Sequence, residues 1–217
     1  MNAEILEVVA RSFYVSSIAI VAASIFAIPL AVYISLAEFK GKKIVLALIN
    51  SFLAIPAVAI GLFCYLLFAR NGFLGFFHLL YTANAMIIAQ ALLAFPIIVA
   101  LTTSGLQTLA KPIRDTLLTL GLGRIQTALS LLFELRKQAA TAIIMAFSRV
   151  IGETGMTLMV GGNIKGATRV MTTTIAMETM KGNFELAITL GLILLSTALI
   201  LNIITQLLLG ETHAPAM

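Results

Sequence analysis

Residues 13–37 read FYVSSIAIVAASIFAIPLAVYISLA, and this run without a charged side chain decides the class of fold. A helix needs about 20 apolar residues to cross the hydrocarbon core of a bilayer. Because lipid offers no hydrogen-bond partners, a spanning segment must satisfy its own backbone groups, and a helix does so. Further charge-free runs of sufficient length occur at 44–69, 72–110 and 186–210. The sequence therefore predicts an all-α integral membrane protein.

The composition of the whole chain agrees with this class. Of the 217 residues, 60% are hydrophobic and 11% are charged, whereas a soluble domain carries roughly 25% charged residues. The net charge of +5 lies in short clusters between the apolar runs, which argues against nucleic-acid binding. Cys64 lies inside an apolar run and is expected to be a buried, inert thiol. His78 and His213 are isolated, so we expect no metal site, no bound cofactor and no enzymatic activity in this chain.

The pattern predicts a single transmembrane domain, residues 1–217, with about five spanning helices. Proline removes a helical hydrogen bond and bends the helix, either as a tolerated kink or as a bend that shapes a pathway. The prolines inside the first three spans are Pro29, Pro56 and Pro96. The five predicted spans are 12–37, 44–69, 85–108, 138–162 and 186–209.

Two shorter segments lie between the spans. Residues 73–84 are too few to cross a bilayer, and we expect them to form an interfacial helix with Phe76, Phe77 and Tyr81 at headgroup depth. Residues 168–180 are expected to form a short helix outside the membrane.

The distribution of Lys and Arg predicts the orientation, because cytoplasmic loops carry an excess of both. With five spans, the 38–43 turn and the 109–137 loop lie on one side, which holds eight cations against five on the other. We therefore expect the 109–137 loop in the cytoplasm and the N-terminus outside. The cations on the first side are Lys40, Lys42, Lys43, Lys111, Arg114, Arg124, Arg136 and Lys137. Those on the opposite side are Arg11, Arg70, Lys165, Arg169 and Lys181.

The 109–137 loop contains two helical patterns, 112–120 and 124–135, separated by Gly121-Leu122-Gly123. Pro112 suits the first turn of a helix, and Gly121 suits a helix end that needs a left-handed residue. The loop is therefore expected to be a helix-turn-helix. From the residues alone, a docking surface for another protein and an amphipathic hairpin on the membrane surface are equally compatible with it.

This loop resembles the cytoplasmic loop of the membrane subunits of bacterial ATP-binding-cassette importers. Their motif is Glu-Ala-Ala, three residues, Gly, nine residues, then Ile-x-Leu-Pro. Here Asp115-Thr116-Leu117 is followed after three residues by Gly121 and after nine more by Leu131-Leu132-Phe133-Glu134. Gly121 is the identical match and Asp115 is a conservative replacement, whereas Thr116, Leu117 and Glu134 depart from the pattern.

A second stretch resembles the tungstate-type branch of these permeases, to which the molybdate permeases are related. It comprises Ser148-Arg149-Val150-Ile151-Gly152-Glu153-Thr154-Gly155, then Met159-Val160-Gly161-Gly162-Asn163-Ile164-Lys165-Gly166, then Arg169-Val170-Met171-Thr172-Thr173. The likeness extends over essentially the whole chain, including the number of spans and the position of the loop.

The resemblance implies a permease subunit in a bacterial or archaeal cytoplasmic membrane that imports an oxyanion, with tungstate as the expected substrate. It implies a homodimer with two cytoplasmic ATPase subunits, which bind ATP and Mg, and an extracytoplasmic oxyanion-binding protein. This chain has no Gly-x-x-x-x-Gly-Lys-Ser/Thr phosphate loop, in agreement with a separate ATPase. The residues implied in ATPase coupling are Asp115, Thr116, Leu117, Leu120, Gly121, Leu122, Gly123 and Arg124.

The fourth predicted span contains two charges, Arg149 and Glu153, one helical turn apart. Each charge is costly in lipid, so we expect the two to pair or to face protein or water. The pair is either a structural tie between helices or part of a gate. A carboxylate repels an oxyanion, so Glu153 is not expected to bind the substrate. The further candidates for a pathway or gate are Met156, Thr157, Val160 and Asn163.

Three alternatives remain open from the residues. Molybdate or sulfate is an alternative substrate within the same class of permease. A self-sufficient secondary transporter would use Arg149 and Glu153 as a coupling relay. A membrane scaffold without transport activity would tolerate changes at the pathway positions.

Overall fold

The computed structural model describes residues 2–37, 39–119, 133 and 136–210, and all regular structure in these ranges is helical. Three helices are long and apolar enough to cross a membrane: α1 (Asn2–Leu36), α4 (Ala83–Thr119) and α9 (Phe184–Gly210). Two further pairs of helices meet the same criterion if each bent pair counts as one span, which gives up to five. The expected all-α membrane fold is confirmed.

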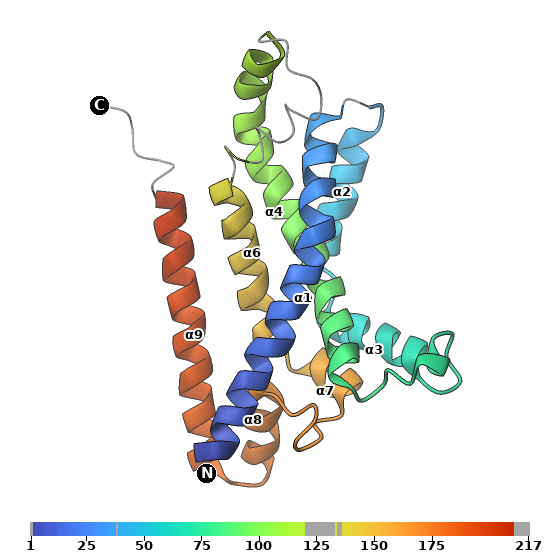
Figure 1. Cartoon of the computed structure of the whole chain (residues 1–217), viewed down its shortest axis with the longest axis vertical. Coiled ribbons are helices and arrows are strands. Elements are labelled where there is room, and N and C mark those ends of the chain that lie inside the picture. Colours follow the sequence, from blue (N-terminus) through green and yellow to red (C-terminus); the bar gives the residue numbers. More distant parts are fainter. Residues whose placement is uncertain (1, 38, 120–132, 134–135, 211–217) are drawn as a thin grey trace.

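Helices α1 and α4 lie side by side and form the most extensive helix–helix contact in the described chain (Figure 1). Small residues make this close approach possible, because backbones can come near each other only where side chains are short. Along α1, alanines recur every four residues on the buried face. They are Ala19, Ala23, Ala27 and Ala31.

The second predicted span is two helices rather than one. Helix α2 (Lys42–Phe52) and helix α3 (Ala57–Phe68) meet at a bend of 88°. Pro56 stands at the start of α3 in an extended conformation, with φ −61° and ψ 128°. The break agrees with the missing N–H of proline and with its effect on the preceding residue. Helices α1 and α4, in contrast, continue through Pro29 and Pro96.

The fourth predicted span is also broken. Helix α6 (Arg136–Ile151) and helix α7 (Gly155–Gly161) meet at a bend of 67°. The prediction of one continuous helix over 138–162 is therefore wrong at residues 152–154. Gly152 and Gly155 flank this break, and glycine is among the weakest helix formers.

The second helices of the two broken spans, α3 and α7, pack against each other, and Figure 1 shows them as neighbours. The contact depends on glycine at two positions. A Cβ atom added at Gly61 would lie 2.8 Å from the Cα atom of Met156. A Cβ atom added at Gly155 would lie 2.9 Å from Cγ2 of Val58. The two halves thus approach almost to backbone contact.

The segment between α3 and α4 does not form the expected interfacial helix. It contains one short 3-10 helix, η1 (Gly75–Phe77), and the backbone turns at His78 and Tyr81, whose φ angles are 51° and 66°. Such positive φ angles interrupt an α-helix. The expected short helix at 168–180 is present as α8 (Met171–Met180). Cys64 is fully buried, as expected.

Helix α4 corrects the prediction for the 109–137 loop. It continues through Pro112 to Thr119, so 112–119 extends the third span and does not begin a separate helix. The second half of the predicted helix-turn-helix, with Leu120 to Arg124, lies outside the described residues. The end of α1, the start of α2, the end of α4 and the start of α6 all lie at the end of the bundle opposite the N-terminus (Figure 1). The placement of the 38–43 turn and the 109–137 loop on the cytoplasmic side remains a prediction.

Candidate functional site

The break between α6 and α7 holds the two charges of the fourth span. Nη1 of Arg149 donates to Oε2 of Glu153 over 2.8 Å. The Glu153 side chain is 11% exposed, whereas the Arg149 side chain is 50% exposed. The expected pairing is thus present, although the two residues do not lie on one continuous helix face.

Glu153 is held by more than its ion pair. Its Oε1 atom accepts a hydrogen bond from the backbone N–H of Met156, over 3.4 Å, at the start of α7. Its backbone carbonyl accepts from the hydroxyls of Thr157 (2.9 Å) and Thr172 (3.1 Å). Arg149 therefore stands at the carbonyl end of α6, and Glu153 stands at the amide end of α7. Both charges have the sign that these helix ends favour.

The other predicted pathway residues are packed inside the chain. Met156 and Val160 are fully buried in the main hydrophobic core, and Thr157 is 1% exposed. Asn163 has a positive φ of 52°. Its Nδ2 donates to Sδ of Met177 over 3.2 Å, while its buried Oδ1 has no partner in the part of the chain that the structure describes. Their role in a pathway or gate remains a prediction.

The predicted coupling residues are only partly described. Asp115, Thr116 and Leu117 belong to the last turns of α4. The remaining ones, Leu120 to Arg124, lie outside the described residues. A role in ATPase coupling remains a prediction for all of them.

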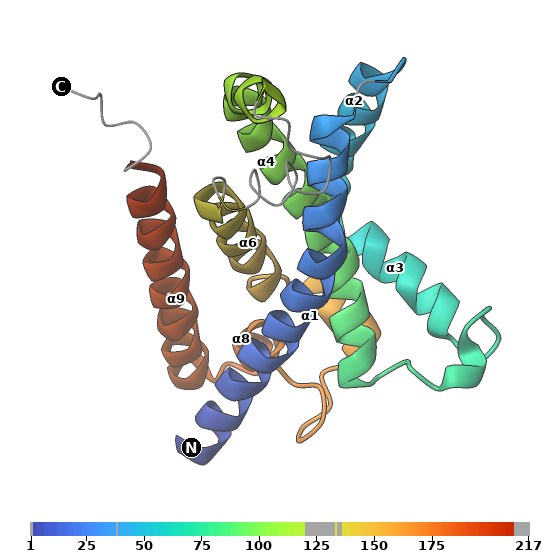
Figure 2. The same ribbon diagram turned by 45° about the horizontal axis from the view of Figure 1, so that its top comes forward.

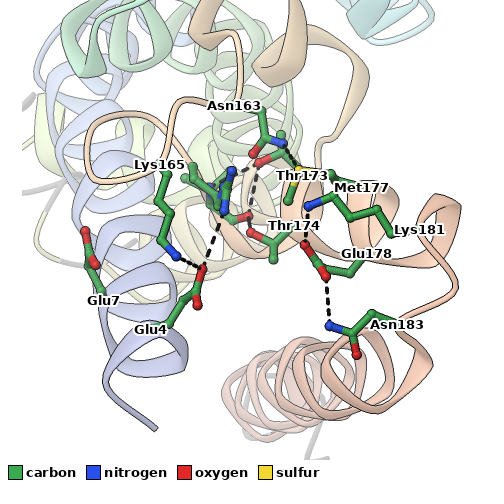
Figure 3. A network of polar contacts seen from close by, with 12 residues as sticks. Glu4, Glu7, Asn163, Lys165, Thr173, Thr174, Met177, Glu178, Lys181 and Asn183 are labelled. Atoms are coloured by element: carbon green, nitrogen blue, oxygen red, sulfur yellow. Dashed lines mark hydrogen bonds and ion pairs between the residues drawn. The ribbon is translucent and has the colours of Figure 1, made fainter. Parts of the chain in front are cut away.

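The sequence reading missed a polar latch at the N-terminal end of the bundle. Arg11 on α1 donates to the carbonyls of Gly166 (2.9 Å) and Arg169 (3.3 Å) in the segment between α7 and α8. Oε1 of Glu4 pairs with Nζ of Lys165 over 3.0 Å and with Nη1 of Arg169 over 3.5 Å (Figure 3). The signal in the sequence was the early charges on α1, but their partners lie more than 150 residues away.

A second polar cluster joins α8 to α9. The buried carboxylate of Glu178 accepts from Nζ of Lys181 (3.0 Å) and from Nδ2 of Asn183 (2.9 Å), as Figure 3 shows. These two hydrogen bonds, first that from Lys181 and then that from Asn183, hold the pKa of Glu178 below its usual value. Within the described ranges, no group of three His, Cys, Asp or Glu side chains is placed to hold a metal ion.

Comparisons with known proteins show the family. Residues 13–210 match the family model described as "binding-protein-dependent transport system inner membrane component". The chain is 38% identical to the tungstate uptake system permease protein TupB of Peptoclostridium acidaminophilum, over 96% of this chain and 91% of that protein. It is 36% identical to a probable anion ABC transporter permease protein of Haloferax volcanii, over 91% and 88%.

The TupB protein of Campylobacter jejuni is 37% identical over 78% of this chain and 71% of its own length. Permeases named for molybdenum and sulfate transport match at 26–27% identity. The family match covers nearly all of the described membrane helices. The chain therefore belongs to the family of inner membrane components of binding-protein-dependent transport systems.

Proposed function

We propose that this chain is the permease subunit of an ATP-driven importer of a tetrahedral oxyanion, with tungstate as the substrate. The observation that carries the proposal is the 38% identity to a tungstate uptake permease over 96% of the chain. Molybdate is the second candidate, because it matches tungstate in charge and nearly in size, and a permease named for molybdenum transport is a more distant relative. Membership of a binding-protein-dependent family argues against a self-sufficient secondary transporter.

The proposal includes partners and an orientation. A second copy of the chain completes the pathway, and two cytoplasmic ATPase subunits bind the ATP and Mg. An extracytoplasmic binding protein delivers the anion, in line with the family description. The N-terminus lies outside and the 109–137 loop lies in the cytoplasm, as the charge distribution favours. The loop then contacts the ATPase through the segment around Asp115 and Gly121.

The break of the fourth span is the proposed pathway element. A charged pair in a spanning segment faces protein or water, since lipid disfavours it. The bend between α6 and α7 gives the segment a joint at which its two halves can change their angle. Gly61 and Gly155 bring α3 against α7, so a movement of one broken span is passed to the other.

The decisive experiment measures ATP hydrolysis by the complex purified through this chain from native membranes. The binding protein is added empty, then loaded with tungstate, molybdate or sulfate. We expect the tungstate-loaded form to stimulate hydrolysis most. Stimulation by the molybdate-loaded form alone would mean that molybdate, rather than tungstate, is the substrate of this importer. Absence of any ATPase from a complex kept intact would overturn the importer assignment.

A variant tests the coupling segment separately. Gly121→Trp is expected to leave the permease dimer intact while abolishing stimulated hydrolysis, because a large side chain would occupy the contact with the ATPase. Gly191→Trp on α9 is the matched control, since a Cβ atom there meets nothing within 4 Å. Full transport by Gly121→Trp would rule out the docking role of this segment.

A further inference from the structure

Arg149 is a cation that stays half exposed within a spanning segment. Its side chain is 50% exposed, in the last turn of α6 before the bend to α7. Figures 1 and 2 both show α6 ending partway along the length of α9, away from either end of the bundle. Lipid strongly disfavours a charge at this depth. The exposed half of Arg149 must therefore meet water or protein.

Most of the hydrogen-bonding capacity of Arg149 is unused within the described chain. A guanidinium carries five N–H donors in a planar fork. In the described residues, Arg149 makes a single hydrogen bond, from Nη1 to Glu153. Because the side chain is half exposed, these other donors are not enclosed by the described chain. The remaining donors are available to a ligand.

The guanidinium is held on one side by Glu153, which is itself anchored. The Glu153 carboxylate that holds it also accepts from the backbone of Met156, and the Glu153 carbonyl is held by two threonine hydroxyls. A ligand at Arg149 would therefore meet a cation that one anchored carboxylate already orients.

The surface beside the guanidinium is open. Gly152 is exposed, and a Cβ atom added to it would meet only the carbonyl oxygen of Ser148, at 3.8 Å. Met145, one turn before Arg149, is 43% exposed. Arg149 is thus followed, three positions later, by an exposed residue without a side chain, and it is preceded by an exposed apolar side chain one turn earlier.

We propose that the guanidinium of Arg149 contacts the transported oxyanion during its passage, and that Glu153 keeps this contact weak. The inference rests on the proposed function and adds the residue that meets the substrate. The planar fork of arginine matches two oxygens of a tetrahedral anion, as it does for phosphate. Arg149 and Glu153 together are neutral, so the site attracts a dianion only through local donors. Conduction requires such a balance, because a site must bind well enough to admit the anion and weakly enough to release it.

The test uses the complete complex reconstituted in lipid vesicles, with tungstate-loaded binding protein. Arg149→Gln removes the cation with little change in length, Arg149→Lys keeps the charge but not the fork, and Arg70→Gln removes an exposed charge elsewhere. We expect Arg149→Gln to lower tungstate uptake by at least about tenfold, equal to about 1.4 kcal/mol. Stimulated ATP hydrolysis should stay close to the wild type, whereas the melting temperature of Arg149→Gln should fall, because the enclosed Glu153 carboxylate loses its counter-charge. Arg149→Lys should fall between the two, and Arg70→Gln should transport normally.

Two results would overturn the inference while the proposed function stands. One is normal uptake by Arg149→Gln in a complex whose wild type transports tungstate. The other is a parallel loss of uptake and stimulated hydrolysis in Arg149→Gln, with Arg149→Lys restoring both, since this pattern describes a structural ion pair. If the wild type responds to molybdate or sulfate instead, the same variants are compared with that anion. If it responds to none of them, the proposed function itself fails.

Glu153→Gln provides a measurement that does not depend on losing activity. It leaves Arg149 without its compensating charge, so the site should hold a dianion more tightly. We expect sulfate enclosed on the release side of the membrane to inhibit uptake at a concentration about tenfold lower than for the wild type. Unchanged inhibition by sulfate in a folded Glu153→Gln complex would contradict the role assigned to the pair.

Discussion

Helices α7 and α9 are both largely apolar, yet they contact their surroundings in opposite ways. Helix α7 is short, broken from α6 and pressed against α3 through Gly61 and Gly155. Helix α9 is continuous, and only 11% of its apolar membrane-spanning stretch is buried inside the chain, compared with 56% for the corresponding stretch of α4. A Cβ atom at Gly191 of α9 meets nothing within 4 Å. Apolar content therefore marks a membrane helix but does not say whether its neighbour is protein or lipid.

The two regions also differ in where their charged residues lie. The broken fourth span carries a charge pair in its interior, and the carboxylate of this pair is almost fully enclosed. Helix α9 carries one acidic residue, Glu185, in its exposed first turn. The same type of substitution should therefore have a large effect in the packed part of the bundle and a small effect on α9.

The largest expected effect is that of Glu153→Lys. It places two cations one turn apart and removes the acceptor of the Met156 N–H group. We expect a loss of about 3 kcal/mol in the stability of the folded protein, near the lower end for breaking a buried pair, because Arg149 is half exposed. The yield of monodisperse protein and its melting temperature measure this loss.

Glu185→Lys is the control for that variant. Its residue is exposed at the start of α9, so the loss is confined to the interaction with the helix end, about 0.3–1 kcal/mol. If both variants lower the melting temperature equally, the enclosed carboxylate has no special role at the break.

Gly61→Ala is expected to have the next largest effect. The new Cβ atom would lie 2.8 Å from the Cα atom of Met156, a backbone atom that cannot rotate away. Overpacking of this kind costs about 1–3 kcal/mol. Gly191→Ala should instead leave stability unchanged or raise it by up to about 1 kcal/mol, since alanine is the better helix former. Thermal unfolding of the two variants, measured side by side, tests this prediction. If Gly61→Ala does not change the stability, α3 and α7 can separate freely.

The sequence predicted the spans better than their breaks. Runs without charge locate α1, α4 and α9, because the membrane imposes one strong rule on every residue of a span. The break at Pro56 was not predictable, since Pro29 and Pro96 have the same local chemistry and sit in continuous helices. Whether a helix continues through proline depends on how its neighbours re-satisfy the backbone, which is a tertiary property.

The same limit applies to the candidate site. The spacing of Arg149 and Glu153 predicted their pairing, because residues four apart are neighbours on a helix. It did not reveal that the helix ends between them or that Thr172 supports the break from another helix. The latch between Arg11 and the segment before α8 joins positions far apart in the chain, and no local periodicity encodes such a contact.

A third pair of variants compares buried hydroxyls in the two regions. Thr205 on α9 donates to the carbonyl of Leu201 over 2.9 Å, the usual pattern for threonine in a helix. Thr141 on α6 is 6% exposed, and its hydroxyl has no hydrogen-bond partner among the described residues. Thr141→Val should therefore raise stability by about 1 kcal/mol, whereas Thr205→Val should change it little. Equal melting temperatures for the two variants would show that Thr141 finds a partner in the membrane-embedded protein.

The smallest expected effect concerns the point where α9 joins the bundle. Hydrogen bonds from Lys181 and Asn183 lower the pKa of Glu178 from its ordinary value of 4.5. A carboxyl with a lowered pKa in the folded state stabilises the protein above its ordinary pKa, and this contribution disappears as the pH falls through the folded value. The melting temperature of the wild type should thus decrease as the pH is lowered below about 4.5.

The melting temperature of Glu178→Gln should be lower than that of the wild type at neutral pH and should fall less on acidification. Glu185→Gln, at a residue without an ion pair in the described chain, should follow the wild-type curve. If Glu178→Gln follows it as well, the cluster does not anchor α9, and the apolar contacts of the helix hold it in place.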